Sequence, residues 1–346
     1  MNLLGDKIHT LPLVVLYLTD GCNSRCVTCD IWRNPRRNMS RAVVEQVASA
    51  AEELQMRWVL LSGGEAMQHP HWPQIAQRLR AAGLHVMLLT NGLLLRKQLA
   101  DVLTSVDEVI VSLDGGTAAT YEAIRGVDAF DLVLEGIQLV RAGGIPVTTR
   151  TTVQQANYHE IPKIIEVACA ADVNSISFLT VDVSSEIAFG PRFVADPALA
   201  LADAGPISVH QPPTSTLSHD DLPRLASVLA EVEQRFAAEF ASGRIAESPA
   251  KLRRMLTYFS AVLGEGDFPR PRCNAPHFST VIEVDGRLRP CYFLPEYGRL
   301  KGGSLAEALN IDTAQALRQA YRSGQRAECE RCVCPLYKGP RSLLRL

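Results

Sequence analysis

The stretch LVVLYLTDGCNSRCVTCDIW, residues 13–32, joins an apolar, β-branched run to three closely spaced cysteines. The spacing Cys22-x3-Cys26-x2-Cys29 places three thiolates on one short loop. Three thiolates can ligate three irons of a 4Fe–4S cubane and leave the fourth iron open, and thiolates are the preferred protein ligands of such clusters. A structural zinc site is the alternative, but it needs a fourth ligand and usually takes paired Cys-x2-Cys knuckles. The loop therefore predicts an iron–sulfur site directly after a first strand.

Beyond this loop, the first half of the chain alternates short apolar runs with amphipathic segments. The predicted strands are Leu13–Leu18, Trp58–Leu61, His85–Leu89, Glu108–Leu113, Pro146–Val153 and Ser175–Val181. The predicted helices are Arg41–Leu54, His71–Ala82, Leu95–Leu103, Phe130–Ala142 and His159–Ala170. Strands that alternate with helices predict parallel βαβ units with right-handed crossovers. The runs are apolar on both faces, as is typical of buried parallel strands. We therefore expect an α/β fold, a partial (β/α)6 TIM-like barrel that stays open because six units are too few for the eight-fold form.

Composition and charge narrow the class of protein. The 346 residues carry a formal net charge of -2, whereas a nucleic-acid partner usually requires a basic face. The longest apolar runs fall far short of the roughly 20 residues of a membrane-spanning helix, and the N-terminus does not resemble a signal peptide. We expect a cytoplasmic protein with no nucleic-acid partner and no membrane partner.

The chain has nine cysteines, and in the reducing cytoplasm clustered cysteines indicate metal binding or catalysis before disulfides. Five of them follow residue 272: Cys273, Cys291, Cys329, Cys332 and Cys334. Asp285-Gly286, between the first two, predicts a hairpin turn. This placement suggests a second metal site, for which a four-cysteine zinc ribbon is an alternative to an iron–sulfur cluster. Cys169 stands alone on a predicted helix, and we interpret it as a buried small hydrophobe.

We divide the chain into three parts: a core over residues 1–181, a linker over 182–272 and a C-terminal domain over 273–346. Within the linker, residues 182–217 are rich in glycine and proline and predict a long irregular excursion. Loops of this length are usually functional, so we expect this segment to cover a substrate. Two helices, Asp220–Ser242 and Pro249–Leu263, are expected to follow it.

The Cys22-x3-Cys26-x2-Cys29 spacing after a first β-strand resembles the signature of the radical S-adenosylmethionine (SAM) superfamily. The resemblance implies that these cysteines hold a 4Fe–4S cluster whose open iron binds SAM. It also implies the chemistry: SAM is cleaved reductively to a 5′-deoxyadenosyl radical, which abstracts a substrate hydrogen. Many members carry an aromatic residue just before the third cysteine, whereas this chain has Thr28.

The resemblance extends to the ends of the following strands. Gly63, Gly64 and Glu65 resemble the element that meets the amino group of SAM, where glycines allow close approach and a carboxylate suits an ammonium. Further contacts with SAM are implied for Asn91, Ser112, Asp114 and Asn157. The alternative for the elements around Asn91, Ser112 and Asp114 is a polar or glycine turn that caps a strand. All these elements lie at the carboxyl ends of strands, where parallel barrels build their active sites.

The C-terminal cysteines resemble the auxiliary-cluster domains called SPASM and twitch. Cys273, a hairpin with Gly286, four more residues and Cys291 match the opening of such domains. A full SPASM domain needs about seven cysteines, so the one-cluster twitch arrangement implies a second 4Fe–4S cluster at Cys273, Cys291, Cys329 and Cys332. Cys334 is then surplus, or it replaces one of the last two.

The resemblance implies a substrate and a reductant as well. The one-cluster layout is similar to that of a dehydrogenase that oxidises an aminocyclitol, and we find no N-terminal extension that resembles a leader-peptide recognition domain. We therefore expect a small molecule, such as a sugar, cyclitol or nucleoside intermediate, that is oxidised, epimerised or decarboxylated, with flavodoxin or ferredoxin as electron donor. The alternatives are a SPASM-type peptide maturase, a radical SAM methyltransferase and, from another class, a zinc-stabilised binding protein.

Overall fold

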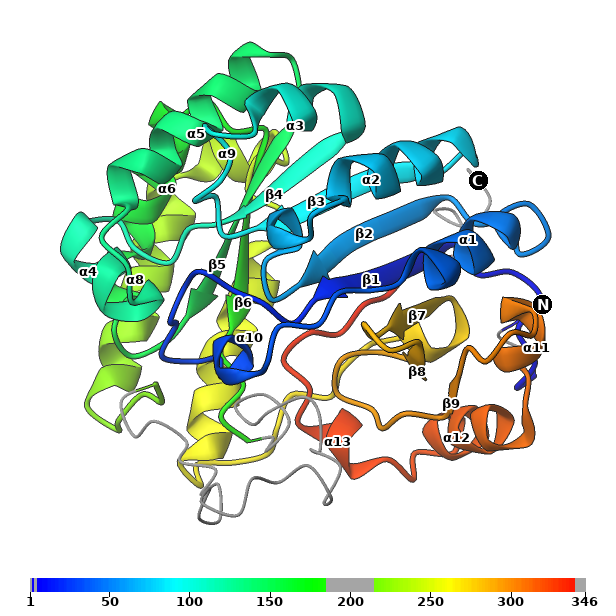
Figure 1. The fold of residues 1–346 in the computed structure, drawn as a ribbon. Coiled ribbons are helices and arrows are strands. Elements are labelled where there is room, and N and C mark those ends of the chain that lie inside the picture. The colour runs from blue at the N-terminus through cyan, green and yellow to red at the C-terminus, as the bar shows by residue number, and fades with distance from the viewer. Residues whose placement is uncertain (1, 3–4, 185–214, 340–346) are drawn as a thin grey trace, which may run out of the picture.

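The computed structural model describes residues 2, 5–184 and 215–339, and its core is a curved parallel sheet covered by helices (Figure 1). Six parallel strands follow the six predicted runs: β1 (Leu13–Thr19), β2 (Trp58–Gly63), β3 (His85–Thr90), β4 (Glu108–Ser112), β5 (Val147–Val153) and β6 (Ser175–Thr180). Each pairs with its sequence neighbour in the order β6-β5-β4-β3-β2-β1. The predicted α/β fold with a six-unit parallel sheet is confirmed.

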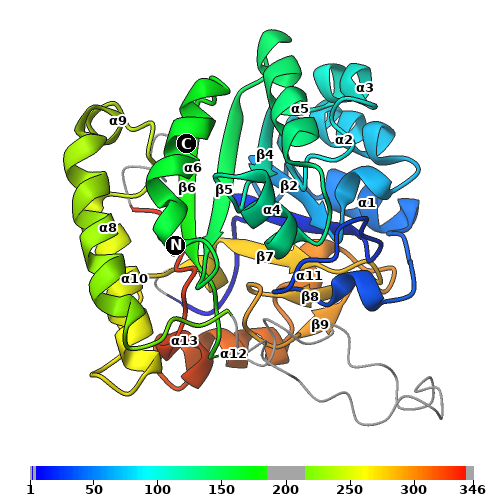
Figure 2. The ribbon, with the colours of Figure 1, turned by 90° about the vertical axis from the view of Figure 1, so that its left-hand side faces the viewer.

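The crossover helices lie on the outer face of the sheet (Figure 2). They are α1 (Arg41–Ser49), α2 (Trp72–Ala81), α3 (Leu99–Ser105), α4 (Ala118–Arg125), α5 (Phe130–Ala142) and α6 (Ile161–Ala170). The Ser40 hydroxyl caps α1 by accepting a hydrogen bond from the Val43 amide at 3.5 Å. The prediction ran α1 on to Leu54, but the structure ends the helix at Ser49, and the chain continues as turns.

Helix α4 is absent from the sequence-based prediction. The Thr117 hydroxyl accepts a hydrogen bond from the Thr120 amide and begins the helix, and Gly126 ends it in the left-handed region at φ 68°. The helix has only eight residues, so its apolar periodicity is too short to stand out in the sequence. It carries Arg125 at its last position, beside the first cysteine loop.

The C-terminal domain continues the same sheet. Strand β7 (Ser279–Ile282) pairs parallel with β1, and β8 (Arg287–Arg289) and β9 (Gly298–Arg299) follow antiparallel. The predicted turn between β7 and β8 is confirmed, with Gly286 at φ 82°. Short helices complete this part: α11 (Leu305–Ala308), α12 (Asp312–Arg322) and α13 (Ala327–Glu330). Figure 1 shows this domain beside β1, on the edge of the sheet opposite β6.

Most of the excursion predicted over 182–217 lies outside the described residues. The helix predicted over Asp220–Ser242 forms α8 (Asp221–Arg235) and α9 (Ala237–Ala241), with a break at Phe236. Helix α10 (Pro249–Val262) follows, and the Ser248 hydroxyl caps it. Between α9 and α10 the chain returns to the sheet, where Ile245 bridges Ile176 of β6.

The inner face of the sheet is more polar than predicted. Strand β5 alternates, with Val147, Thr149, Thr151 and Val153 buried under the helices and the residues between them facing inward. The prediction of strands that are apolar on both faces is therefore wrong for β5, because its inner face borders a cavity instead of packed core.

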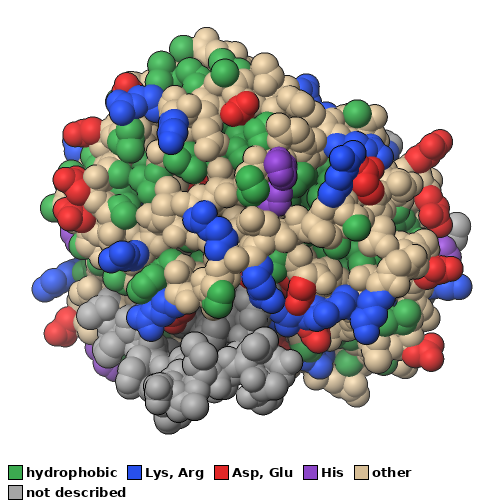
Figure 3. Space-filling view, viewed as in Figure 1, with side chains coloured by type: hydrophobic (Ala, Val, Ile, Leu, Met, Phe, Trp, Pro, Cys, Tyr) green, Lys and Arg blue, Asp and Glu red, His purple; other side chains and the backbone are tan. Residues whose placement is uncertain are grey.

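Basic and acidic side chains are interspersed over the face drawn in Figure 3. Among the residues that the structure describes, no helix is both long and apolar enough to cross a bilayer.

The N-terminal segment is tied to the C-terminal domain by Asn310. Its side-chain oxygen accepts a hydrogen bond from the Ile8 amide at 2.7 Å, and its nitrogen donates to the Ile8 carbonyl at 2.9 Å. We predict that Asn310→Ala lowers the free energy of unfolding by about 1–3 kcal/mol, because two backbone groups lose their partner. The measurement is the urea midpoint of the anaerobic holoprotein. Lys301→Ala, at an exposed position of the same domain, is the control and should leave the midpoint unchanged; equal midpoints for both variants would contradict the assignment.

Candidate functional site

The first cysteine loop leaves the end of β1 and rests on α4. Cys22, Cys26 and Cys29 are half-buried and lie on the loop between β1 and the short helix that begins at Ile31. The loop backbone is held by two hydrogen bonds, from the Arg25 amide to the Arg125 carbonyl at 3.0 Å and from the Val27 amide to the Ile124 carbonyl at 2.9 Å. These contacts fix the loop on α4.

Burial makes the thiols of this loop poor acids on their own. It raises the pKa of Cys22 to about 12 and that of Cys26 to about 11, although the Arg125 guanidinium opposes the rise at Cys26. Bound metal ions deprotonate a coordinating thiol. The donor set of three half-buried thiols therefore fits an iron–sulfur cluster, which would supply the positive charge that the protein does not.

The loop after β2 packs tightly against the cysteine loop. The Gly64 amide donates to the Thr19 carbonyl at 2.7 Å, and the Glu65 amide donates to the Gly21 carbonyl at 2.8 Å. A Cβ atom at Gly64 would lie 2.2 Å from the Gly21 oxygen, and Gly63 has φ 127°. Both positions therefore require glycine, because one allows no side chain and the other lies outside the region that side chains favour.

Glu65 is the buried carboxylate of this region. It accepts hydrogen bonds from the Asn91 amide at 2.7 Å, the Thr90 hydroxyl at 2.9 Å and the Met67 amide at 3.0 Å. Burial raises its pKa, and these donors oppose the rise. A carboxylate has about four acceptor positions, so one remains for a further donor such as an ammonium group.

Asn91 joins the third strand to the cysteine loop. Its side-chain nitrogen donates to the Asn23 side-chain oxygen at 2.8 Å and lies 3.8 Å from the Cys22 sulfur. The structure therefore brings Cys22, Glu65 and Asn91 together, as a site at the carboxyl ends of neighbouring strands requires.

Asp114 forms a buried ion pair. Its Oδ2 lies 2.8 Å from Nη1 of Arg125, and its Oδ1 accepts from the Thr152 amide at 2.7 Å. Arg125 in turn lies close enough to Cys26 for its charge to act on that thiol. The pair lies beside the cysteine loop, and the Asp114 carboxylate is occupied by Arg125 and the Thr152 amide.

Asn157 and Ser112 differ in whether their side chains already make hydrogen bonds within the protein. The Asn157 side chain accepts from the Gln154 amide and donates to the Asp114 and Thr152 carbonyls, so its hydrogen bonds go to the backbone. Ser112 faces the inside of the sheet at the end of β4, and no hydrogen bond of its hydroxyl is found among the described residues. The SAM contacts expected of these two residues remain predictions.

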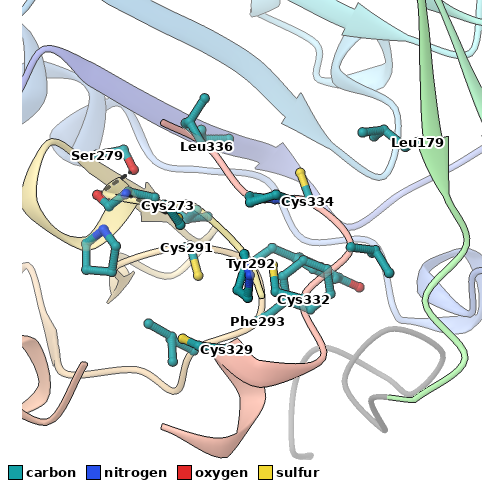
Figure 4. A pocket seen from close by; sticks show the side chains of 18 of the residues that line it. Leu179, Cys273, Ser279, Cys291, Tyr292, Phe293, Cys329, Cys332, Cys334 and Leu336 are labelled. Carbon is teal, nitrogen blue, oxygen red and sulfur yellow. Dashed lines mark hydrogen bonds between the residues drawn. The ribbon is translucent and has the colours of Figure 1, made fainter. Parts of the chain in front are cut away.

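The C-terminal cysteines gather below β1. Cys273 precedes β7, Cys291 follows β8, Cys329 lies on α13, and Cys332 and Cys334 follow that helix. Burial raises the pKa of Cys291 to about 12 and that of Cys329 to about 11, and the two thiols interact electrostatically with each other and with Cys273. In Figure 4 the sulfurs of Cys291 and Cys329 lie in the lower part of the view, whereas that of Cys334 points to the opposite side.

These cysteines do not converge as the ligands of one small ion would. Within residues 2, 5–184 and 215–339, no three His, Cys, Asp or Glu side chains are close enough together to hold a single metal ion. Thiolates around one zinc ion lie at about 2.3 Å from it, which requires tight convergence. A cubane of four irons separates its ligands further, so this finding concerns a single ion and not a cluster.

A cavity of about 1540 Å³ connects the inside of the sheet to the C-terminal cysteines (Figure 4). All five cysteines after residue 272 line it, together with inward-facing residues of β1 to β6. Cys334 lies deep in the protein, yet its side chain is accessible, because it borders this cavity.

Sequence reasoning missed the polar side chains of this cavity. Arg150 on β5, Glu247 between α9 and α10, and Lys251 on α10 all line it. The signal for Arg150 was present, since an arginine in the alternating run VTTRTTV falls on the face of β5 opposite the buried valines. Nothing in the sequence indicated that the chain before α10 returns to β6 and brings Glu247 into the cavity.

Comparison with known proteins identifies two domains. Residues 16–168 match the radical SAM superfamily, and residues 273–333 match SPASM, an iron–sulfur cluster-binding domain. A radical SAM domain implies a 4Fe–4S cluster and SAM, and a SPASM domain implies auxiliary iron–sulfur clusters.

Curated relatives match the N-terminal half. The AdoMet-dependent heme synthase of Methanosarcina barkeri is 34% identical over 166 residues, which are 45% of this chain and 46% of that protein. A probable GTP 3′,8-cyclase of Saccharolobus islandicus is 33% identical over 167 residues, which are 47% of this chain and 54% of that protein. The chain thus spans about half the length of the curated relatives it matches.

Solved structures match nearly the whole chain at low identity. SuiB of Streptococcus suis bound to S-adenosylmethionine has a TM-score of 0.65 and 12% identity, covering 96% of this chain and 74% of that one. Native anSMEcpe with bound AdoMet has a TM-score of 0.64 and 16% identity, covering 94% and 89%. At this identity the likeness concerns the fold.

The close approach of Gly64 to the cysteine loop gives a direct test. We predict that Gly64→Ala displaces the loops after β1 and β2 at a cost of about 1–3 kcal/mol, because the new Cβ would overlap the Gly21 carbonyl. The variant should lose the change in the cluster's EPR spectrum that SAM produces. Gly5→Ala is the matched control, since a Cβ there would meet no atom within 4 Å. A normal SAM-dependent spectrum in Gly64→Ala would refute the packing argument.

Proposed function

Because the chain combines a radical SAM domain with a C-terminal SPASM domain, we propose that it is an enzyme that uses SAM to abstract a hydrogen atom from a small biosynthetic molecule. The observation that carries the proposal is the cavity inside the sheet, which all five C-terminal cysteines line. It leaves room for a substrate beside an auxiliary cluster, as oxidation of a substrate radical requires.

We propose that Cys22, Cys26 and Cys29 hold the first 4Fe–4S cluster and that the loops after β2, β3 and β4 hold SAM. With these groups bound, the reduced cluster supplies an electron that cleaves SAM to methionine and a 5′-deoxyadenosyl radical, which takes hydrogen from the substrate. The protein's residues bind and orient the reactants and exclude water.

The SAM contacts follow from the local structure. Glu65 would accept from the amino group with its remaining lone pair, and Gly63 and Gly64 allow the backbone to approach. Ser112 would donate from the inner face of β4. Asp114 pairs with Arg125, and Asn157 donates to the Asp114 carbonyl. We therefore propose that these two residues position the SAM pocket and do not contact SAM themselves.

The auxiliary cluster is assigned to Cys273, Cys291, Cys329 and Cys332. All four are half-buried, which supports this set. Cys334 is more accessible and points away from Cys291 and Cys329, which supports its assignment as the surplus cysteine.

The names of the relatives bear on the class of substrate. The relatives with the higher identity are a heme synthase and probable GTP cyclases, whose names point to small molecules. A structural neighbour, SuiB, has been crystallised with its precursor peptide SuiA, at 14% identity. We propose a small molecule as substrate, with a peptide as the second candidate, and flavodoxin or ferredoxin as the electron donor in the cytoplasm.

The cluster assignment predicts the iron content after anaerobic reconstitution. The wild type should bind about eight irons, and the Cys22/Cys26/Cys29→Ala triple variant about four, because each cubane holds four. With dithionite, the wild type should convert SAM to 5′-deoxyadenosine, and the triple variant should not.

Other outcomes would refute parts of this function. About four irons that fall to none in the variant would leave the C-terminal domain without an iron–sulfur cluster, and iron in neither protein would refute the function as a whole. S-adenosylhomocysteine in place of 5′-deoxyadenosine would indicate methyl transfer.

The assignment of the surplus cysteine can be tested in the triple-variant background. Cys334→Ser should keep the remaining four irons, whereas Cys332→Ser should lose them or leave an incomplete cluster, because it removes a ligand. Iron and sulfide analysis with Mössbauer spectroscopy measures both. The reverse result would make Cys334 the ligand and Cys332 the spare.

A further inference from the structure

We infer that Arg150 binds an oxyanion of the substrate, a carboxylate or a phosphate, inside the barrel. This inference deepens the proposed function and rests on it. Arg150 lies in the middle of β5, in register with Ser112 of β4 and Ser177 of β6, and lines the cavity that reaches the C-terminal cysteines.

The guanidinium of Arg150 has no partner among the residues that the structure describes. Its Nε is buried without a hydrogen-bond partner, and no ion pair of Arg150 occurs within residues 2, 5–184 and 215–339. Arg125, by contrast, pairs with Asp114 at 2.8 Å. A buried charge without a counter-charge is costly, so a half-buried arginine of this kind indicates that an anion completes the site.

Two acids of the cavity, Glu247 and Glu108, accept hydrogen bonds from other groups. Glu247 accepts from the Phe178 amide at 2.8 Å and the Ser177 hydroxyl at 3.1 Å, and Lys251 lies 3.4 Å from it. Glu108, at the opposite end of the strands, accepts from the Thr148 hydroxyl at 3.1 Å. Lys251 is thus paired with Glu247, whereas no ion pair of Arg150 is found in the described part of the chain.

The position of Arg150 points to substrate and not to SAM. Arg150, Lys251 and Glu247 all act electrostatically on Cys334, on the side of the cavity that faces the C-terminal domain. Cys26, which does not line this cavity, is influenced by Arg125 and Asp114 instead. An anion held by Arg150 would therefore lie in the cavity beside the C-terminal cysteines, where we place the substrate.

The chemistry of the side chain defines the class of ligand. A guanidinium is planar and presents donors in a fork that matches a carboxylate or a phosphate in a bidentate manner. The expected substrate carries such a group, as an organic acid or a phosphorylated metabolite does.

The test uses two anomalous-scattering anions, selenate for phosphate and 4-bromobenzoate for a carboxylate. Crystals of the anaerobic, SAM-bound holoenzyme are soaked with each, and binding in solution is measured by calorimetry. We expect one anion at the Arg150 guanidinium, with affinity lowered about tenfold or more in Arg150→Gln and less in Arg150→Lys, because a charge-assisted pair is lost. Arg41→Gln, whose parent side chain is 92% exposed, is the control and should bind the anion as the wild type does.

The same variants separate this inference from the proposed function. Arg150→Gln should keep the iron content, the SAM affinity and the slow cleavage of SAM without substrate. Loss of SAM affinity would assign Arg150 to the carboxylate of SAM. If neither anion binds at Arg150 in the wild type, the inference is also overturned. A shift of the auxiliary-cluster potential in Arg150→Gln would not rescue it.

Discussion

Strand β1 is the element on which the rest of the structure depends, because it is hydrogen-bonded to β2 on one side and to β7 on the other. The loop after β1 carries the first cysteines, and β7 follows Cys273 of the second set. The distance between the two proposed clusters is therefore set by one parallel ladder and not by a flexible linker. An oxidation that passes an electron across a substrate needs such a fixed separation, and backbone hydrogen bonds provide it without any side chain.

Much of this arrangement is predictable from the sequence. The six parallel strands, most of their helices and the hairpin at Gly286 follow from periodicity and turn chemistry. The sequence also predicts a close backbone approach at Gly63 and Gly64, but it expects this approach toward SAM, whereas the structure shows Gly64 against the backbone of the cysteine loop. Local patterns of this kind can be predicted because residues that are neighbours in the sequence determine them.

What the sequence could not provide depends on contacts between distant residues. The parallel pairing of β7 with β1 joins segments more than 250 residues apart, and no local pattern encodes it. Helix α4 is too short for its periodicity to be seen. It positions Arg125, whose buried partner Asp114 comes from another part of the chain. Arg150 is visible as a polar residue in a strand, but only the structure shows that no acid of the described chain reaches it.

The shared strand also affects how the protein is made. During synthesis β1 and β2 emerge early, whereas residues 279–282 of β7 follow about 260 residues after β1. At translation rates of about 5–20 residues per second, the open edge of β1 waits roughly 13–52 s for its partner. Unpaired strand edges attract other chains, so the nascent barrel is exposed to aggregation during this interval. Slow synthesis at low temperature lengthens the interval, and production of the protein should therefore benefit more from a chaperone that covers strand edges than from cooling alone.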